Sequence, residues 1–221
     1  MGGPEFNVVE IFDSIDGEGK RTGELATFIR LAGCNLRCSY CDTPYGLDFK
    51  EGTLMEISEI IDKCKEYGNK NITLTGGEPL ARGLIHDLIS ELSLQGFEVN
   101  IETNGSISLY NIPKMKNVFY TMDYKCPSSG VEDKMDLKNL EFLDENDVLK
   151  FVVGNELDLS NCKYILQNYN IKAQVYISPV FTKIEPVEIV NYMKAHKGIF
   201  KNSRVQVQLH KIIWNPDERG V

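Results

Sequence analysis

Short apolar runs alternate with segments of helical periodicity along most of the 221-residue chain. This alternation is typical of βα units, in which successive strands lie parallel in one sheet and helices cover its faces. Residues 128–147 are weakly periodic, so a complete barrel of eight units is not expected. We predict an α/β fold, a partial, open TIM-type barrel of about six parallel strands with a reduced set of helices. The runs expected as strands are residues 25–31, 71–75, 98–103, 118–122, 148–153, 173–178 and 205–209.

Capping residues mark the helices that are expected between these strands. The first helix is predicted to begin at Thr53, with Glu56 completing a capping box, and to end at Gly68. Its apolar face includes Cys64, which we therefore expect in the core, and the next helix is expected to point Leu84 inward. The two further helices are expected at residues 84–95 and 187–196.

The composition limits the kinds of partner that are expected. A chain that is 42% hydrophobic and 25% charged is ordinary for one globular domain, here residues 1–221. The net charge of -8 and pI near 5.0 argue against a nucleic-acid surface, which needs clustered basic residues. No apolar run is long enough for a membrane span, and no secretion signal is recognised, so we expect a cytoplasmic protein with reduced thiols. Residues 1–6 look unlike the start of a strand or helix and are interpreted as partly a cloning remnant.

Three cysteines, Cys34, Cys38 and Cys41, lie within one short segment after the first expected strand. Thiolates select soft metals and iron–sulfur clusters, so this segment is interpreted as a redox metal site. The alternative is a structural zinc knuckle, which would need a fourth Cys or His close by. The other cysteines are scattered singly, and the sequence assigns them no role: Cys64, Cys126 and Cys162.

The cysteine spacing resembles the signature of the radical S-adenosylmethionine (radical SAM) superfamily, including an aromatic residue, Tyr40, before the third cysteine. The resemblance implies a radical SAM core with one 4Fe-4S cluster per chain on Cys34, Cys38 and Cys41. The iron atom without a protein ligand would bind S-adenosylmethionine (SAM).

Two further motifs follow expected strands, at the carboxyl ends where parallel sheets hold their chemistry. Gly76, Gly77 and Glu78 resemble the superfamily motif that binds the SAM amino group, and a glycine pair there permits close approach of the backbone to a ligand. Residues 102–105, Glu-Thr-Asn-Gly, come after the next strand. Their polar groups either face the same site or form a capped turn, and both interpretations stay open.

Over nearly its whole length the chain resembles the 7-carboxy-7-deazaguanine synthases. The segments that carry this resemblance are Glu10-Ile11-Phe12 with Asp16-Gly17-Glu18-Gly19, Phe28-Ile29-Arg30 with Cys41-Asp42-Thr43, Lys125 with Pro127-Ser128-Ser129, and Gln208-Leu209-His210-Lys211 with Trp214 and Arg219-Gly220-Val221. The resemblance implies a homodimeric lyase that converts 6-carboxy-5,6,7,8-tetrahydropterin to 7-carboxy-7-deazaguanine. The reaction proceeds by hydrogen abstraction and ring contraction with loss of ammonia, in queuosine-type 7-deazapurine biosynthesis.

The same resemblance implies roles for individual residues. Thr43 would bind Mg²⁺, and Arg30 would bind the substrate carboxylate. Asp16 stands where the family usually has Gln, so a contact that needs an amide N–H would be lost and one that needs only an acceptor would survive. Asp123 stands where the family often has a small polar residue. The substrate-binding residues implied are Ile15, Asp16, Gly17, Glu18, Arg30, Thr75, His210 and the terminal carboxylate of Val221. The SAM-binding residues implied are Tyr40, Asp42, Gly76, Gly77, Glu78, Asp123, Tyr124, Lys125, Ser178 and Pro179.

Two other functions are kept as alternatives. A glycyl-radical-enzyme activating protein has the same cysteine spacing but acts on a protein. That function does not explain the residues found from His210 to Val221. A non-catalytic metal-binding interaction module would cleave no SAM. For the enzyme, a flavodoxin or ferredoxin is expected as the electron donor.

Overall fold

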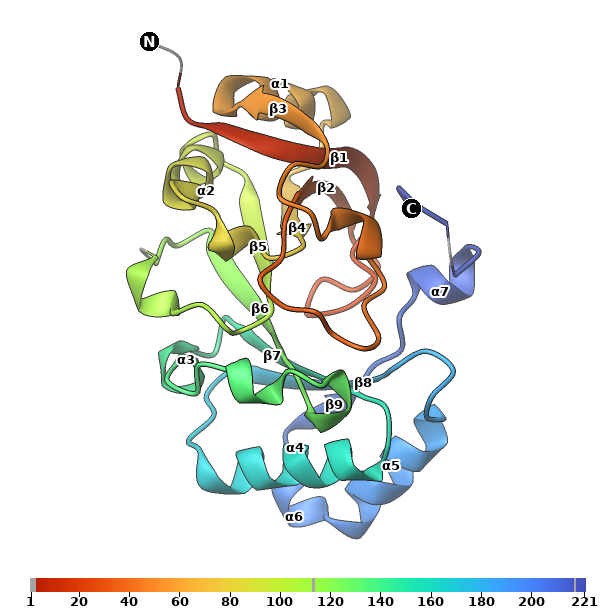
Figure 1. Ribbon diagram of the computed structural model, residues 1–221. Helices are drawn as coiled ribbons and strands as arrows, with labels where there is room; N and C mark the ends of the chain where they lie inside the picture. The colour runs from red at the N-terminus through yellow and green to blue at the C-terminus, as the bar shows by residue number, and fades with distance from the viewer. Residues whose placement is uncertain (1–2, 113, 217) are drawn as a thin grey trace.

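The computed structural model describes residues 3–112, 114–216 and 218–221. The strands of these residues form one sheet in the order β3-β1-β2-β4-β5-β6-β7-β8-β9 (Figure 1). Strands β2 and β4 to β9 pair in parallel, whereas β1 pairs antiparallel with β2 and β3. The strand bounds are β1 Glu5–Ile15, β2 Leu25–Leu31, β3 Thr53–Glu56, β4 Asn71–Gly76, β5 Glu98–Thr103, β6 Val118–Tyr124, β7 Val148–Val153, β8 Gln174–Pro179 and β9 Ser203–Val205.

The predicted open, mostly parallel α/β architecture is confirmed. In the described part of the chain β3 and β9 are the two edges of the sheet, so the barrel stays open. Strand β9 is short and ends where the last expected strand, residues 205–209, was predicted to begin. The antiparallel strands β1 and β3 were not expected from the sequence.

The N-terminal segment contributes to the sheet, although residues 1–6 were judged unlike the start of a strand or helix. Strand β1 begins at Glu5, and Phe6 pairs with Met55 of β3. The Phe6 side chain is only 2% exposed and belongs to the hydrophobic core. Removing it from water stabilises the fold by about 2 kcal/mol. Residues 1 and 2 lie outside the described residues.

The first helix, α1, begins later than predicted because residues 53–56 extend the sheet as β3. Glu56 is therefore the N-cap itself, and its capping-box partner is Glu59. Cys64 is fully buried, as expected, but Leu84 precedes α2 with a φ of 61° and is exposed. The helices are α1 Ile57–Tyr67, α2 Ile85–Leu94, α3 Asn139–Phe142, α4 Glu156–Asn168, α5 Pro186–Ala195, α6 Lys197–Phe200 and α7 His210–Ile213.

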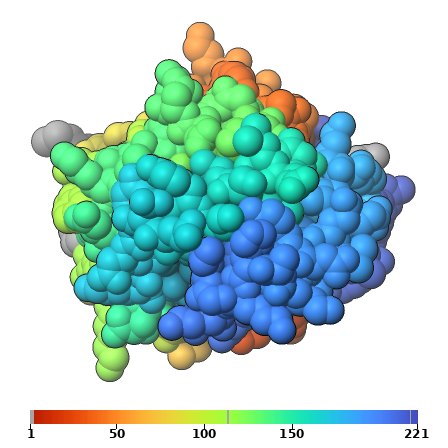
Figure 2. Space-filling model, turned by 90° about the horizontal axis from the view of Figure 1, so that it is seen from below, coloured from red at the N-terminus to blue at the C-terminus, as the bar shows by residue number. Residues whose placement is uncertain are grey.

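The helices leave one end of the sheet free for a site. Helices α4, α5 and α6 gather at one end of the molecule and form much of the face seen in Figure 2. The C-terminal segment with α7 lies apart from them, beside the open side of the sheet (Figure 1). None of the described helices is both long enough and apolar enough to cross a membrane.

Candidate active site

A cavity of about 480 Å³ opens at the carboxyl ends of the parallel strands. The cysteine segment follows β2, the glycine pair ends β4, and polar side chains at the ends of β5 and β6 complete this wall. The C-terminal segment closes another side. The predicted site residues that line this cavity are Gly17, Glu18, Arg30, Cys34, Cys38, Tyr40, Cys41, Asp42, Thr43, Thr75, Gly76, Gly77, Asp123, Lys125, His210 and Val221.

The thiols of Cys34, Cys38 and Cys41 all face this cavity. Burial raises the pKa of the Cys34 and Cys38 thiols, and the nearby ammonium group of Lys125 opposes the rise for Cys38. Among the described residues, no three His, Cys, Asp or Glu side chains converge as they stand on a single metal ion. Three thiols around one cavity are the donor set that an iron–sulfur cluster requires, so the residues present fit that cofactor.

The glycine pair after β4 is required by its packing on the cysteine segment. A Cβ atom on Gly76, whose φ is 146°, would lie 2.1 Å from the carbonyl oxygen of Leu31. One on Gly77 would lie 2.3 Å from the carbonyl oxygen of Gly33. The close approach is therefore to the backbone of the neighbouring strand and its loop, and it brings both glycines into the cavity wall beside Cys34.

Glu78, the next residue, does not line the cavity. Its carboxylate is 1% exposed and accepts hydrogen bonds from the backbone amides of Leu80 (3.0 Å) and Asn104 (2.6 Å) and the Thr103 hydroxyl (2.9 Å). Burial raises the pKa of Glu78 to about 7 against the effect of these donors. The side chain thus joins the end of β4 to the turn after β5.

A row of buried and half-buried charges crosses the cavity wall. Lys150 Nζ lies 3.1 Å from Glu18 Oε2 and 3.6 Å from Asp123 Oδ2, and Lys125 Nζ lies 3.1 Å from the same Asp123 oxygen. Burial opposes the charge of Lys150, but Glu18 and Asp123 outweigh it and raise the pKa of Lys150. Burial likewise opposes ionisation of Glu18, but Lys150 prevails and lowers the pKa of that carboxylate. Both shifts favour the charged forms of Lys150 and Glu18.

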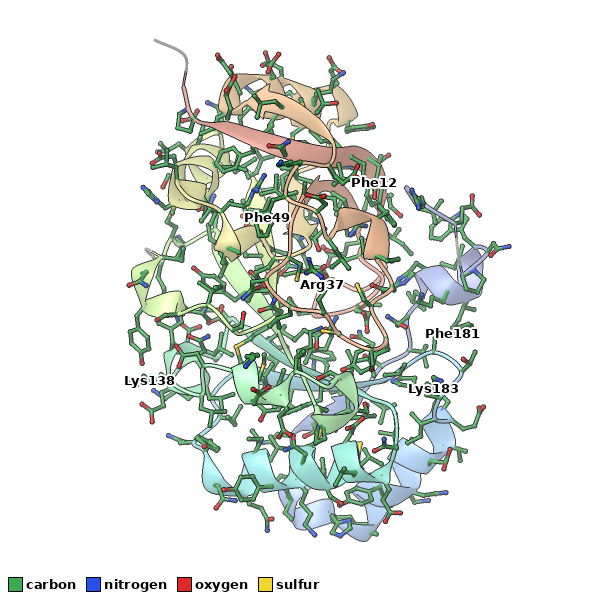
Figure 3. All side chains as sticks on the ribbon, viewed as in Figure 1. Phe12, Arg37, Phe49, Lys138, Phe181 and Lys183 are labelled. Atoms are coloured by element: carbon green, nitrogen blue, oxygen red, sulfur yellow. The ribbon has the colours of Figure 1, made fainter. Side chains whose placement is uncertain are left out.

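The sequence analysis missed Lys150. The signal was present, because Lys150 is the one charged residue in the apolar run 148–153, and a lysine in a buried strand needs a carboxylate partner. The other lining residues that were not predicted include Tyr45, Val152, Phe181 and Lys183. Phe181 and Lys183 follow β8 and lie on the side of the molecule nearest the C-terminal segment (Figure 3).

Aromatic and charged groups surround Arg30 at the other end of the cavity. The guanidinium Nε donates to Glu10 Oε1 at 2.6 Å, and the Tyr45 hydroxyl donates to the same oxygen at 3.1 Å. Phe12, labelled in Figure 3, stacks on Phe28 with ring centroids 5.0 Å apart, and both rings line the cavity. This end of the site therefore combines a flat apolar surface with a cation.

The C-terminal segment is held against the cavity by backbone and side-chain contacts. The Leu209 amide donates to the Gly17 carbonyl oxygen at 3.1 Å, and a Cβ atom on Gly17 would lie 2.3 Å from His210 Nδ1. Burial lowers the pKa of His210, so the imidazole is neutral at pH 7. Arg219 lies over the Tyr45 ring at 3.7 Å, which holds the segment that ends at Val221 beside the cavity.

The other predicted residues lie outside the cavity wall, for identifiable reasons. Asp16 is 2% exposed, accepts from Arg21 Nε at 2.8 Å and from the Thr73 hydroxyl at 2.6 Å, and so balances a buried guanidinium. Tyr124 points to the other face of β6 and packs against Phe151. The remaining residues outside the wall are Ile15, at the end of β1, and Ser178 and Pro179, buried in β8 with Ser178 beside Glu18.

Known proteins resemble this chain in sequence and in fold. The sequence pattern of the Radical SAM superfamily matches residues 28–136. The chain is 49% identical to 7-carboxy-7-deazaguanine synthase of Clostridium acetobutylicum, over 98% of this chain and 99% of that one. It is 37% identical to the enzyme of that name from Leptospira interrogans, over 97% and 98%. The crystal structure of QueE from Escherichia coli superposes with a TM-score of 0.73 at 23% identity, over 92% of this chain and 94% of that one, which supports the fold.

The open parallel sheet, the cysteine segment and the superfamily match define a radical SAM enzyme, the class whose cofactors are a 4Fe-4S cluster and SAM. Within that class, the identities over nearly full length decide the family. The chain belongs to the 7-carboxy-7-deazaguanine synthase family.

Proposed function

We propose that this protein converts 6-carboxy-5,6,7,8-tetrahydropterin to 7-carboxy-7-deazaguanine. The observation that carries the proposal is that one cavity contains the three cysteines, a row of buried charges and an aromatic surface beside Arg30. A cavity of about 480 Å³ suits small molecules. The names of the relatives favour this reaction over the activation of a glycyl-radical enzyme.

In this proposal, Cys34, Cys38 and Cys41 hold the cluster. When bound, the cluster and SAM supply a 5'-deoxyadenosyl radical, which is the chemistry the protein itself lacks. Asp123 and Lys125 bind SAM with the backbone of the glycine pair. In support, Asp123 Oδ1 is buried and has no hydrogen-bond partner among the described residues, which leaves an acceptor for an N–H or O–H group of a ligand.

The substrate would lie toward Arg30. A guanidinium fork matches a carboxylate, and Glu10 already fixes its orientation. The flat pterin ring suits the face of the Phe12–Phe28 pair, and Glu18 and the backbone of Gly17 can accept hydrogen bonds from its amino and ring N–H groups. Holding one C–H bond next to the radical is a proximity effect that the rigid strand ends provide.

A magnesium site is proposed at Thr43. The Thr43 hydroxyl donates to Asp42 Oδ1 at 3.1 Å, and both residues line the cavity. Hard oxygen donors with few protein ligands suit Mg²⁺, which keeps several waters. Replacing Thr43 by Val, which removes the oxygen and keeps the shape, should then raise the Mg²⁺ concentration needed for half-maximal activity by tenfold or more.

One assay tests the proposal directly. Anaerobically reconstituted protein is incubated with dithionite, SAM, Mg²⁺ and carboxytetrahydropterin, and 7-carboxy-7-deazaguanine is sought by mass spectrometry. The triple variant Cys34→Ala/Cys38→Ala/Cys41→Ala is the control and should form neither this product nor 5'-deoxyadenosine. Release of deoxyadenosine without the deazaguanine would assign another radical substrate, and a colourless zinc protein would support the non-catalytic module.

The assembly, electron donor and compartment belong to the same proposal. Family resemblance supports a homodimer, which light scattering tests, and a flavodoxin or ferredoxin as donor, which substitution for dithionite in the assay tests. The described cysteines are all free thiols, which is compatible with work in the cytoplasm. Export of the protein from cells would contradict that location.

A further inference from the structure

The turn after β5 contacts the cysteine segment through Asn104, a residue that the proposed function leaves without a role. Asn104 is 6% exposed and lines the cavity. Its Oδ1 accepts from the Ser106 amide at 3.0 Å and the Ser106 hydroxyl at 2.6 Å. Because a backbone amide can only donate, the oxygen of the side-chain amide must face Ser106, and the NH₂ group must face the other way.

That NH₂ group points to the cysteine segment. Asn104 Nδ2 lies 3.1 Å from Asn35 Oδ1 and 3.8 Å from Cys34 Sγ, within hydrogen-bonding range of a sulfur acceptor. Asn35 in turn donates from its own Nδ2 to the Ser106 hydroxyl at 2.8 Å. The two segments are therefore linked by a closed set of side-chain hydrogen bonds around one thiol.

Glu78 prevents this arrangement from relaxing. Its buried carboxylate accepts hydrogen bonds from the backbone amide of Asn104 at 2.6 Å and from the Thr103 hydroxyl at 2.9 Å. These two bonds fix the backbone that carries the Asn104 side chain. A donor held in this way needs no reorganisation when charge appears at the sulfur. Residues 102–105, Glu-Thr-Asn-Gly, were expected either to form a capped turn or to face the site. Both apply, since Glu78 caps the turn and the side-chain amide of Asn104 faces the site.

We propose that Asn104 is a positioning residue for the cluster, which donates a hydrogen bond to the Cys34 thiolate and so raises the cluster's reduction potential. The inference rests on the proposed role of Cys34 as a ligand. One-electron reduction adds negative charge to the cluster and its thiolates, and an N–H donor stabilises the reduced form more than the oxidised form. Hydrogen bonds to cluster sulfurs are a recognised control of potential.

The test is an EPR-monitored redox titration of the reconstituted full chain without SAM or substrate. Asn104→Ala should lower the equilibrium constant for cluster reduction about threefold to tenfold, which is a fall of about 30 to 60 mV for a one-electron couple. Asn69→Ala is the matched control, because Asn69 precedes β4 at the opposite end of the sheet, and its midpoint should equal that of the wild type.

If Asn104→Ala binds too little iron for a titration, Asn104→Ser decides. Serine keeps a short oxygen acceptor for the turn but cannot reach the Cys34 sulfur, so its midpoint should fall in the same way. If the Asn104 variant is fully loaded with iron and has the wild-type midpoint, the inference is overturned and the proposed function is left standing. A wild-type protein that binds no cluster would overturn it together with the proposed function.

Discussion

At the scale of single residues, the site depends on charges that are buried together. Lys150 pairs with two carboxylates of different proposed roles, since Glu18 is proposed to bind the substrate and Asp123 to bind SAM. Charge at such depth is tolerated only when it is paired, so each partner depends on the other. The motifs indicated Glu18 and Asp123, whereas Lys150 belongs to none of the motifs, and the structure was needed to identify its partners.

Lys150→Met should therefore be costly in stability as well as activity. The substitution leaves the Glu18 carboxylate without its ion-pair partner, whereas Asp123 keeps Lys125, and we expect a loss of about 3 to 5 kcal/mol in the free energy of unfolding. The double variant Lys150→Met/Glu18→Gln should recover most of that loss, since the charge that has lost its partner is removed as well. Urea denaturation of the apoprotein measures both, and strictly additive effects of the two substitutions would contradict the pairing.

The buried carboxyl group of Asp16 predicts a pH dependence of stability. Burial raises the pKa of Asp16 from 3.8 to about 6, although Arg21 opposes the rise. The folded protein thus binds this proton more tightly than the unfolded chain. The stabilisation is fully present below about pH 4 and is lost as the pH rises through about 6. The total effect is about 3 kcal/mol.

The comparison is between the wild type and Asp16→Asn, with the unfolding free energy of each apoprotein followed from pH 4 to pH 7. The variant carries a constant penalty from the weakened contact with Arg21 but has no group to titrate at this position. The stability of the wild type relative to the variant should therefore fall with rising pH over this range. A constant difference would mean that Asp16 titrates normally in the folded protein.

At the scale of elements, local patterns predicted most of the parallel strands and both motifs at their ends. Short runs rich in apolar residues made β4, β5 and β7 recognisable in the sequence, because these strands are covered on both faces. Strand β3 was taken for the first turn of a helix, since Glu56 fits an N-terminus and only pairing with the distant β1 extends residues 53–56. The roles of Glu78 and Asn104 also needed the fold, because their partners come from other strands.

At the scale of the whole molecule, the C-terminal segment meets strands β1 and β2 at the cavity. The segment after α7 reaches the loop that follows the cysteines, where Arg219 lies over Tyr45, and Tyr45 contacts the Glu10–Arg30 pair of β1 and β2. The proposed substrate end of the site is therefore assembled from separate parts of the sequence: strands β1 and β2, the loop that follows the cysteines, and the C-terminal segment. The family resemblance indicated that the ending of the chain belongs to the site, but not which contact holds it there.

Arg219→Ala should raise the substrate KM about threefold with little change in kcat. A cation–π contact of this kind contributes about 0.5 to 1 kcal/mol, and the loss affects the position of the terminal segment rather than the radical chemistry. Arg219→Lys keeps a cation for the Tyr45 ring and should recover part of the affinity. Steady-state kinetics at saturating SAM measures the effect, and an unchanged KM in Arg219→Ala would separate this segment from substrate binding.

The packing of Gly76 and Gly77 on residues 31–33 has a consequence for how the enzyme matures. It anchors the base of the cysteine loop to the sheet through main-chain contacts that involve no iron. Small zinc domains differ, because most of their folding free energy comes from the ion itself. Here a chelator should remove the colour of the cluster and leave the cooperative thermal unfolding of the protein intact. The newly made polypeptide can therefore fold before the iron–sulfur cluster is inserted.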